Sequence, residues 1–247
     1  MGGVNDLSFP QQKPEAGSRK EPVMLTDRLA LHEMYTLLLD HFGPQHWWPG
    51  DTPDEILAGC VLSQNTRWER VVPVIVRLKQ VNILSPCKLA GLTVDKLAGY
   101  LLGCGTYRRK SEYLHELAAY FTENGWTGDC DSMAHIDTDT LRSELLSLRG
   151  IGPETADCIL LYVLERPVFV IDAYARRILG RHSIESAHAS YPELQAFFHK
   201  SLERDQSLFN EYHALLVRCG KEFCRPKPRC DGCPLEFMID VHGKQVH

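Results

Sequence analysis

Residues 149–157 read RGIGPETAD and residues 168–172 read VFVID, and these two stretches decide the fold of this 247-residue chain. Two glycines separated by one residue permit a tight reversal with positive φ and leave their backbone N–H groups uncovered. Pro153 suits the first turn of a new helix, where its missing N–H costs nothing. Exposed amides at such a helix N-terminus can bind a phosphate, although an ordinary helical hairpin without a ligand explains the same residues.

Helical spacing of apolar residues extends outward from this hairpin in both directions. A first helix runs from Leu25 to Gly43-Pro44, and Val168–Ile171, which has a strand-like composition but no partner strand, is predicted to be an extended link into a helix near Ala173. The fold class is therefore all-α, with no internal repeat. Further helices are predicted near residues 54–63, 67–80, 93–102, 107–124, 138–148, 191–203 and 208–220.

Composition narrows the class of protein. A hydrophobic content of 44% and an aromatic content of 9% are typical of a globular chain. Apolar runs stay far below the roughly 20 residues that cross a bilayer, and the N-terminus lacks an apolar signal segment, so we expect a cytoplasmic protein without a membrane partner. The net charge is −5, so any contact with nucleic acid must use local basic patches and backbone amides.

Cysteine usage points to a metal. Of nine cysteines, four fall within fifteen residues near the C-terminus, and in a reducing compartment such a cluster favours metal binding over disulfides. The four are Cys219, Cys224, Cys230 and Cys233.

Taken together, RGIGPETAD and the following VID resemble the helix–hairpin–helix, Gly/Pro-rich loop and aspartate signature of the endonuclease III superfamily of DNA glycosylases. Upstream, LSQNT at 62–66 resembles that family's DNA-inserting glutamine segment, and GTYRRK at 105–110 resembles its second DNA-facing loop. The match covers about residues 25–235 in order. It implies a two-lobed helical glycosylase fold with a C-terminal Cys-rich loop, acting as a monomer on double-stranded DNA that contains a lesion.

This resemblance assigns the chemistry to Asp172. Breaking an N-glycosidic bond builds positive charge on the sugar, and a nearby carboxylate can stabilise it or position the attacking water. Asp172 also precedes a helix, so it can act as an N-cap, and the two roles can coexist. Superfamily members that also cut the strand carry a lysine where this chain has Glu154. Because a carboxylate cannot form an imine, we expect a monofunctional glycosylase without AP-lyase activity.

The base pocket is predicted from Trp47 and Trp48, with Lys221 as a further lining residue. Stacked indoles favour a cationic ring by about 0.5–2 kcal/mol, although a hydrophobic plug explains the pair as well. Paired tryptophans with a non-lysine hairpin resemble the methylpurine glycosylases of the endonuclease III type. The expected substrate is therefore an alkylated purine. Excision of mismatched uracil or thymine, or of another base, is an alternative, and a non-catalytic helix–hairpin–helix DNA-binding protein is an alternative of another class.

DNA contacts are predicted on several loops. Gln64 would fill the space left by the extruded base, and Thr106 occupies the second wedge position. Basic side chains and the hairpin glycines would contact phosphates. These residues are Arg108, Lys110, Gly150, Gly152, Arg225 and Lys227.

The spacing of the cysteine cluster departs from the family pattern. The resemblance implies a [4Fe–4S] cluster, and Cys224, Cys230 and Cys233 match the first three ligands. The fourth position is Ile239, which cannot bind iron, and Cys219 is the nearby replacement. A four-thiolate zinc site and a loop without metal are the alternatives. The predicted organisation is a flexible tail at 1–24, a central helical domain at 45–166 containing the helix–hairpin–helix, and a second domain formed by 25–44 and 167–247.

Overall fold

The computed structural model describes residues 21–48, 50–184 and 188–238, with the side chains of 21–27 excepted, and within these residues it contains helices and no strand. The predicted all-α class is confirmed. The elements are α1 (Glu21–Phe42), α2 (Pro53–Leu62), α3 (Trp68–Gln80), α4 (Pro86–Ala90), α5 (Val94–Tyr100), α6 (Tyr107–Glu123), the 3-10 turn η1 (Cys130–Met133), α7 (Thr138–Ser147), α8 (Pro153–Tyr162), α9 (Ala173–Arg181), α10 (Tyr191–Ser201) and α11 (Gln206–Glu222).

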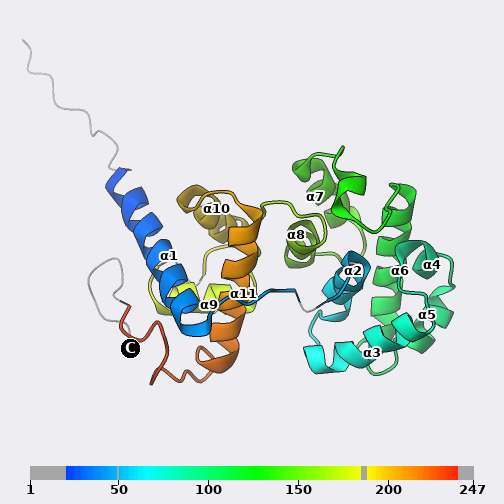
Figure 1. Cartoon of the computed structure of the whole chain (residues 1–247), viewed down its shortest axis with the longest axis horizontal. Coiled ribbons are helices and arrows are strands. Elements are labelled where there is room, and N and C mark those ends of the chain that lie inside the picture. The colour runs from blue at the N-terminus through cyan, green and yellow to red at the C-terminus, as the bar shows by residue number, and fades with distance from the viewer. Residues whose placement is uncertain (1–20, 49, 185–187, 239–247) are drawn as a thin grey trace, which may run out of the picture.

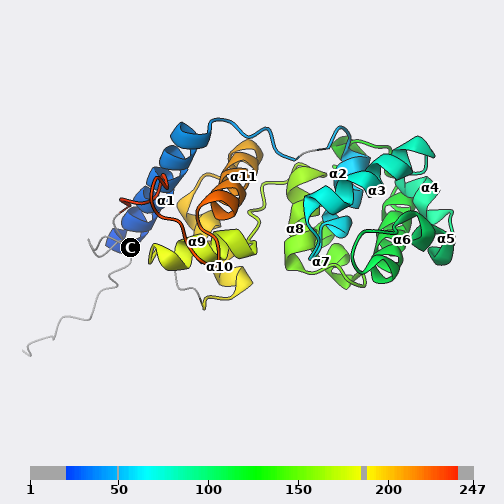
Figure 2. The ribbon, with the colours of Figure 1, turned by 90° about the horizontal axis from the view of Figure 1, so that it is seen from below.

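The helices gather in two groups that lie side by side (Figures 1 and 2). We call α2 to α8 the first lobe, and α1 together with α9 to α11 the second lobe. The chain crosses between them twice, once after α1 and once between α8 and α9. The second crossing is the segment VFVID, which runs extended into Asp172 as the sequence predicts.

Local sequence signals fix where the helices that frame this crossing begin. Gly152 and Pro153 open α8, and Asp172 caps α9. Ser190 and Glu193 form a reciprocal capping box at the start of α10. In the second lobe, the Phe169 ring stacks on Phe198 with 3.7 Å between centroids. The crossing segment is therefore anchored on its apolar face immediately before the aspartate, which limits how Asp172 can move.

The structure corrects the predicted flexible tail at 1–24. Residues 1–20 lie outside the described residues, whereas residues 21–24 form the first turn of α1. Pro22 fits there because a first helical turn has no backbone acceptor for its missing N–H. None of the described helices combines the length and the hydropathy that a membrane crossing requires.

Candidate active site

A cleft of about 780 Å³ is lined by residues of both lobes. Gln64 and Glu154 line it from the first lobe, and Asp172, His213 and Lys221 line it from the second. Trp47 and Trp48, on the first crossing, complete this part of its wall. The cleft therefore brings together the predicted catalytic aspartate, the base-pocket residues and two of the predicted DNA-contacting residues, Gln64 and Arg225.

Asp172 is held at two points. Its Oδ1 accepts a hydrogen bond of 2.7 Å from the Ala175 N–H, the N-cap bond of α9. Its Oδ2 lies 3.7 Å from Nε2 of His213. The residue is only 8% exposed, yet it lines the cleft. The N-cap role is thus observed, and the same geometry leaves a fixed carboxylate beside a space that is open to solvent.

Glu154 is a second carboxyl group in the same cleft, in the first turn of α8. Desolvation raises its pKa, and the negative charge of Asp172 raises it further, while His213 opposes both effects. Its presence where a Schiff-base lysine is expected leaves the cleft without an amine at that position.

The raised pKa of Glu154 predicts a pH-dependent stabilisation by Glu154→Gln. A carboxyl whose pKa is higher in the folded state than in the unfolded state lowers the stability of the fold as pH rises through that pKa. The variant should therefore melt at a higher temperature than the parent at pH 8, and the difference should vanish below about pH 4. Thermal melts across pH measure this. Glu203→Gln, at an exposed site away from the cleft, is the control; an equal gain at pH 8 in both variants would contradict the assignment.

The two hairpin glycines differ in backbone conformation. Gly150 adopts φ +78, and its backbone lies against the ring of Tyr113. Gly152 has φ −92 and ψ 177 as the N-cap of α8, so the positive φ predicted for both glycines is wrong for Gly152. Both glycines are exposed, and no backbone acceptor among the described residues pairs with either N–H. The two amides are therefore free to bind a phosphate.

Gln64 is bound to this hairpin. Its Nε2 donates to the Gly150 carbonyl at 3.1 Å and to Thr155 Oγ1 at 3.0 Å. The glutamine and the hairpin thus form one edge of the cleft. Insertion of Gln64 into a duplex would replace these two hydrogen bonds with bonds to DNA.

Lys110 does not face DNA, and its predicted phosphate contact is wrong. The residue is 1% exposed, because it projects from α6 into the interior. Its Nζ donates to the Leu62 carbonyl at 2.7 Å and to Thr66 Oγ1 at 2.6 Å. Burial lowers its pKa, and the neighbouring thiol of Cys104 opposes that shift. Lys110 therefore fixes the C-terminal end of α2 and the loop that carries Gln64.

We expect Lys110→Met to destabilise the fold by about 1–3 kcal/mol, because the buried Leu62 carbonyl loses its charged donor. Urea unfolding measures the change. Arg108→Met is the control: Arg108 is exposed two residues earlier, so its removal should change stability by less than about 0.5 kcal/mol while weakening DNA binding. Equal stabilities for the two variants would refute the structural role of Lys110.

The other predicted DNA-contacting side chains are exposed. Thr106 occupies the N-cap position of α6, and Arg108 follows it with its guanidinium 5.7 Å from the Tyr107 ring centroid. Arg225 lines the cleft, and Lys227 lies beyond it on the Cys-rich loop. All four can be reached by a duplex without rearrangement of the core.

The tryptophan pair is not a parallel stack. Trp47 and Trp48 meet edge to face, at 5.7 Å between centroids and 62° between planes, and Trp48 also contacts Trp68 and Tyr162. Lys221 places its ammonium 5.3 Å from the Trp47 ring centroid. A cation thus already occupies a face of the indole that was predicted to attract a cationic base.

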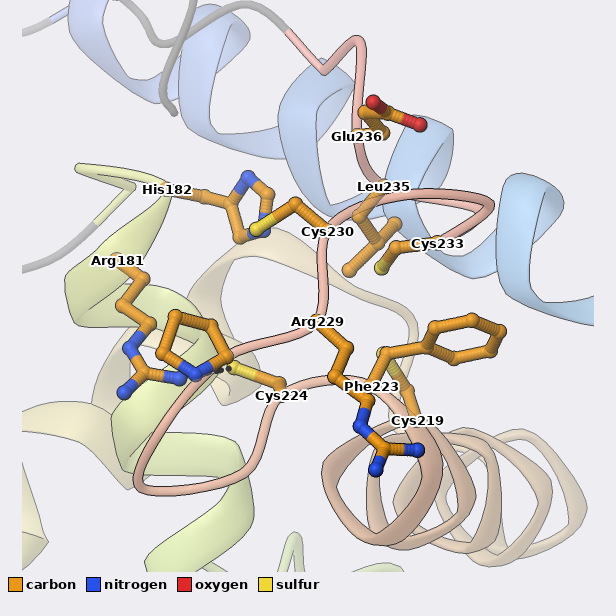
Figure 3. Close-up of a pocket in the computed structure, with 11 residues that line it drawn as sticks. Arg181, His182, Cys219, Phe223, Cys224, Arg229, Cys230, Cys233, Leu235 and Glu236 are labelled. Atoms are coloured by element: carbon orange, nitrogen blue, oxygen red, sulfur yellow. Dashed lines mark hydrogen bonds between the residues drawn. The ribbon is translucent and has the colours of Figure 1, made fainter.

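The four clustered cysteines line a separate cavity of about 120 Å³, together with Arg181 and His182 (Figure 3). A hydrogen bond between Cys219 and Cys233 raises the pKa of Cys219 and lowers that of Cys233 to about 7. Cys224 accepts a bond of 3.2 Å from Arg181. Among the described residues no three His, Cys, Asp or Glu side chains are spaced to hold a metal ion, so these thiols do not form a preformed metal centre. Ile239 lies outside the described residues.

Two further residues of the site, His213 and Tyr162, were not predicted from the sequence. His213 is buried in α11, and Tyr162 ends α8 with its hydroxyl hydrogen-bonded to His213 Nδ1. Both lie on helix faces whose sequence is typical of a hydrophobic core. They are 51 positions apart, so only the packing of α8 against α11 brings them together.

Comparisons with known proteins agree with this geometry. The sequence pattern of the HhH-GPD superfamily of base excision DNA repair proteins matches residues 58–204. A putative DNA repair glycosylase of Methanocaldococcus jannaschii, MJ1434, is 41% identical over 85% of this chain and 96% of its own length. The structure of 3-methyladenine DNA glycosylase MagIII of H. pylori bound to 1,N6-ethenoadenine is similar, with a TM-score of 0.66 and 27% identity over 80% of this chain and 97% of that one. A non-covalent endonuclease III–DNA complex has the same fold, with a TM-score of 0.70 and 21% identity over 84% and 92% of the two chains.

Proposed function

Because the chain belongs to the HhH-GPD superfamily of base excision DNA repair proteins, we propose that it is a monofunctional DNA glycosylase that excises an alkylated purine. The observation that carries the proposal is Asp172, a nearly buried carboxylate fixed by its N-cap bond at the wall of the cleft. A cleft of about 780 Å³ has room for a nucleotide turned out of a duplex.

In this proposal the bond between C1′ and the base nitrogen breaks with its electron pair leaving on the base. Asp172 stabilises the positive charge that builds on the sugar, and water then adds to C1′ and releases one proton to solvent. An alkylated purine that carries a positive charge needs no added proton to leave, so one carboxylate supplies sufficient chemistry. The products are a free base and an intact strand with an abasic site.

The absence of strand cutting follows from Glu154. A lyase step needs an amine that attacks C1′, and the carboxylate at this position cannot form that bond. Borohydride trapping on abasic DNA tests the point: the parent should give no covalent adduct. Glu154→Lys, which supplies an amine at the same position, is the matched positive variant. An adduct with the parent protein would contradict the monofunctional assignment.

The contact of Lys221 with Trp47 favours a second candidate, a glycosylase for neutral damaged bases. An ammonium over the indole repels a cationic base and leaves a neutral one undisturbed. Lys221→Met separates the two candidates. If Lys221 excludes cationic bases, its removal should raise excision of 7-methylguanine relative to excision of 1,N6-ethenoadenine, and this result would favour the neutral-base candidate. An unchanged ratio would favour the cationic purine.

Single-lesion duplexes test the function as a whole. Each duplex carries 7-methylguanine, 1,N6-ethenoadenine, mismatched uracil or mismatched thymine, and mass spectrometry detects any free base. Release of 7-methylguanine above the other bases is the expected result, and preferred release of 1,N6-ethenoadenine would favour the neutral-base candidate. Preferred release of uracil or thymine would show that the substrate is a mismatched pyrimidine. Binding of every duplex without release of any base would indicate a non-catalytic DNA-binding protein.

For the partner and the cofactor, we propose that a monomer binds lesion-containing duplex DNA and that the thiols of Cys219, Cys224, Cys230 and Cys233 hold a [4Fe–4S] cluster. The support is that all four thiols line one cavity, although they would have to draw closer to bind. Iron, zinc and sulfide analysis of protein purified without oxygen decides among a cluster, a zinc site and a metal-free loop. The basic residues Arg225 and Lys227 remain available for phosphates in each case.

A further inference from the structure

Three nearly buried polar side chains, two from helices and one from a helix N-cap, meet at the wall of the cleft. Tyr162 of α8 hydrogen-bonds Nδ1 of His213 in α11, and Nε2 of the same ring lies 3.7 Å from Oδ2 of Asp172, which caps α9. The exposed fractions are 6% for Tyr162, 4% for His213 and 8% for Asp172. A separation of 3.7 Å is longer than a hydrogen bond, so the contact between the imidazole and the carboxylate is electrostatic.

The position of the imidazole proton follows from its neighbours. Burial raises the pKa of the Tyr162 phenol well above its usual range, so the hydroxyl keeps its proton. If His213 is neutral and Tyr162 donates to Nδ1, the ring proton sits on Nε2. If His213 is protonated, Nε2 again carries a proton. In the remaining tautomer the Nε2 lone pair would face a carboxylate, which is repulsive.

A purely structural histidine does not account for this arrangement. Nε2 of His213 is buried and has no hydrogen-bond partner within the described residues, and an unsatisfied buried group is costly. Its nearest charged neighbour is the proposed catalytic carboxylate. Tyr162 holds the imidazole so that the Nε2–H of His213 faces the carboxylate of Asp172. Such an arrangement can position the carboxylate electrostatically.

We propose that His213, held by Tyr162 with its proton on Nε2, is a positioning residue that orients Asp172 beside the sugar. The inference rests on the proposed function of Asp172 and adds two residues to it. With Oδ1 bonded to the Ala175 N–H and Oδ2 facing His213, the carboxylate is restrained in its orientation.

The tautomer can be measured without any substrate. In protein labelled with ¹⁵N-histidine, multiple-bond ¹H–¹⁵N correlations report which ring nitrogen carries the proton, and the His213 signals are assigned by their loss in His213→Gln. We expect a protonated Nε2 in the parent and a loss of this fixed pattern in Tyr162→Phe. A parent ring protonated on Nδ1 alone would overturn the inference.

Kinetics test the consequence for base release. His213→Leu should lower the single-turnover rate at saturating DNA about 10- to 100-fold, because the carboxylate loses its orientation. The half-saturating protein concentration should change by less than about twofold, because His213 is only 4% exposed and offers little surface for binding. His213→Gln, whose amide can donate from a similar place, should recover most of the rate. A His213→Leu rate equal to that of the parent, or no recovery by Gln in a protein that melts normally, would overturn the proposal.

The two measurements keep the inference separate from the proposed function. If the parent releases no base from any duplex, the proposed function fails, and the tautomer measurement still decides whether His213 directs a proton at Asp172. If His213→Leu does not fold, the comparison of Tyr162→Phe and His213→Gln with the parent decides the kinetic part. In that comparison we expect a reduced rate in Tyr162→Phe and a near-parental rate in His213→Gln.

Discussion

Asp172→Asn is expected to abolish base release while leaving the fold and DNA binding intact. Asparagine caps a helix about as well as aspartate, so the bond to the Ala175 N–H can persist. The negative charge that stabilises the developing cation is lost, and we expect the single-turnover rate to fall at least about 100-fold. DNA affinity should stay equal or rise, since a negative charge near the phosphate backbone is removed. Rapid-quench kinetics and a binding titration measure the two effects.

Asp205→Asn provides the matched control. Asp205 caps α11 through an equivalent bond of 2.7 Å to the Leu208 N–H, and it does not line the cleft. The two substitutions therefore make the same chemical change at the same structural position of a helix. Normal activity in Asp205→Asn beside an inactive Asp172→Asn would show that charge in the cleft matters, rather than capping. An active Asp172→Asn would remove this residue from the chemistry.

The second large effect is expected from Gly150→Ala. A Cβ at this position would clash with the ring of Tyr113, and φ +78 disfavours any L side chain. The conformational strain and the overpacking together should cost about 2–4 kcal/mol. For a chain of this size that corresponds to a melting temperature lowered by about 5–15 °C. Because the Gly150 carbonyl accepts the Gln64 amide, DNA affinity should also fall.

Gly152→Ala separates the two glycines. A Cβ there meets nothing within 4 Å, and its φ of −92 suits alanine. We expect a smaller loss of stability than in Gly150→Ala, about 1 kcal/mol, because alanine is a poorer N-cap than glycine but meets neither a clash nor a positive φ here. Scanning calorimetry of both variants is the measurement. Equal losses of stability in the two variants would contradict the geometry of the hairpin.

Much of the fold is predictable from local sequence. The hairpin, the helices at 138–148 and 191–203, and the extended link before Asp172 depend on turn residues, caps and short-range apolar spacing, and each appears in the structure close to its predicted bounds. The short helix α4 was not predicted, because five residues are too few to establish a helical period.

Side-chain direction is less predictable than backbone. Lys110 was grouped with Arg108 because both are basic and near in sequence, yet two positions along a helix turn a side chain by more than half a revolution. Lys110 therefore points into the interior, towards the Leu62 carbonyl. The edge-to-face geometry of Trp47 and Trp48, and the placement of Lys221 over an indole, likewise depend on packing between lobes.

The candidate site was predicted where it rests on a contiguous motif and missed where it does not. Asp172 and Glu154 follow from the motif at 149–172. His213 and Tyr162 lie on the buried faces of α11 and α8, among apolar residues, and no spacing rule connects two helices that pack only in the folded chain. Pairing of buried polar residues across helices requires the tertiary structure.

The most direct test of the account is the identity of the product. Purified protein is incubated with methylated duplex DNA, and the low-molecular-mass fraction is analysed by mass spectrometry while the strands are sized on a denaturing gel. A monofunctional alkylpurine glycosylase should release free methylpurine and leave strands that stay uncut until alkali is added. Methylated DNA that is bound but yields no free base would contradict it.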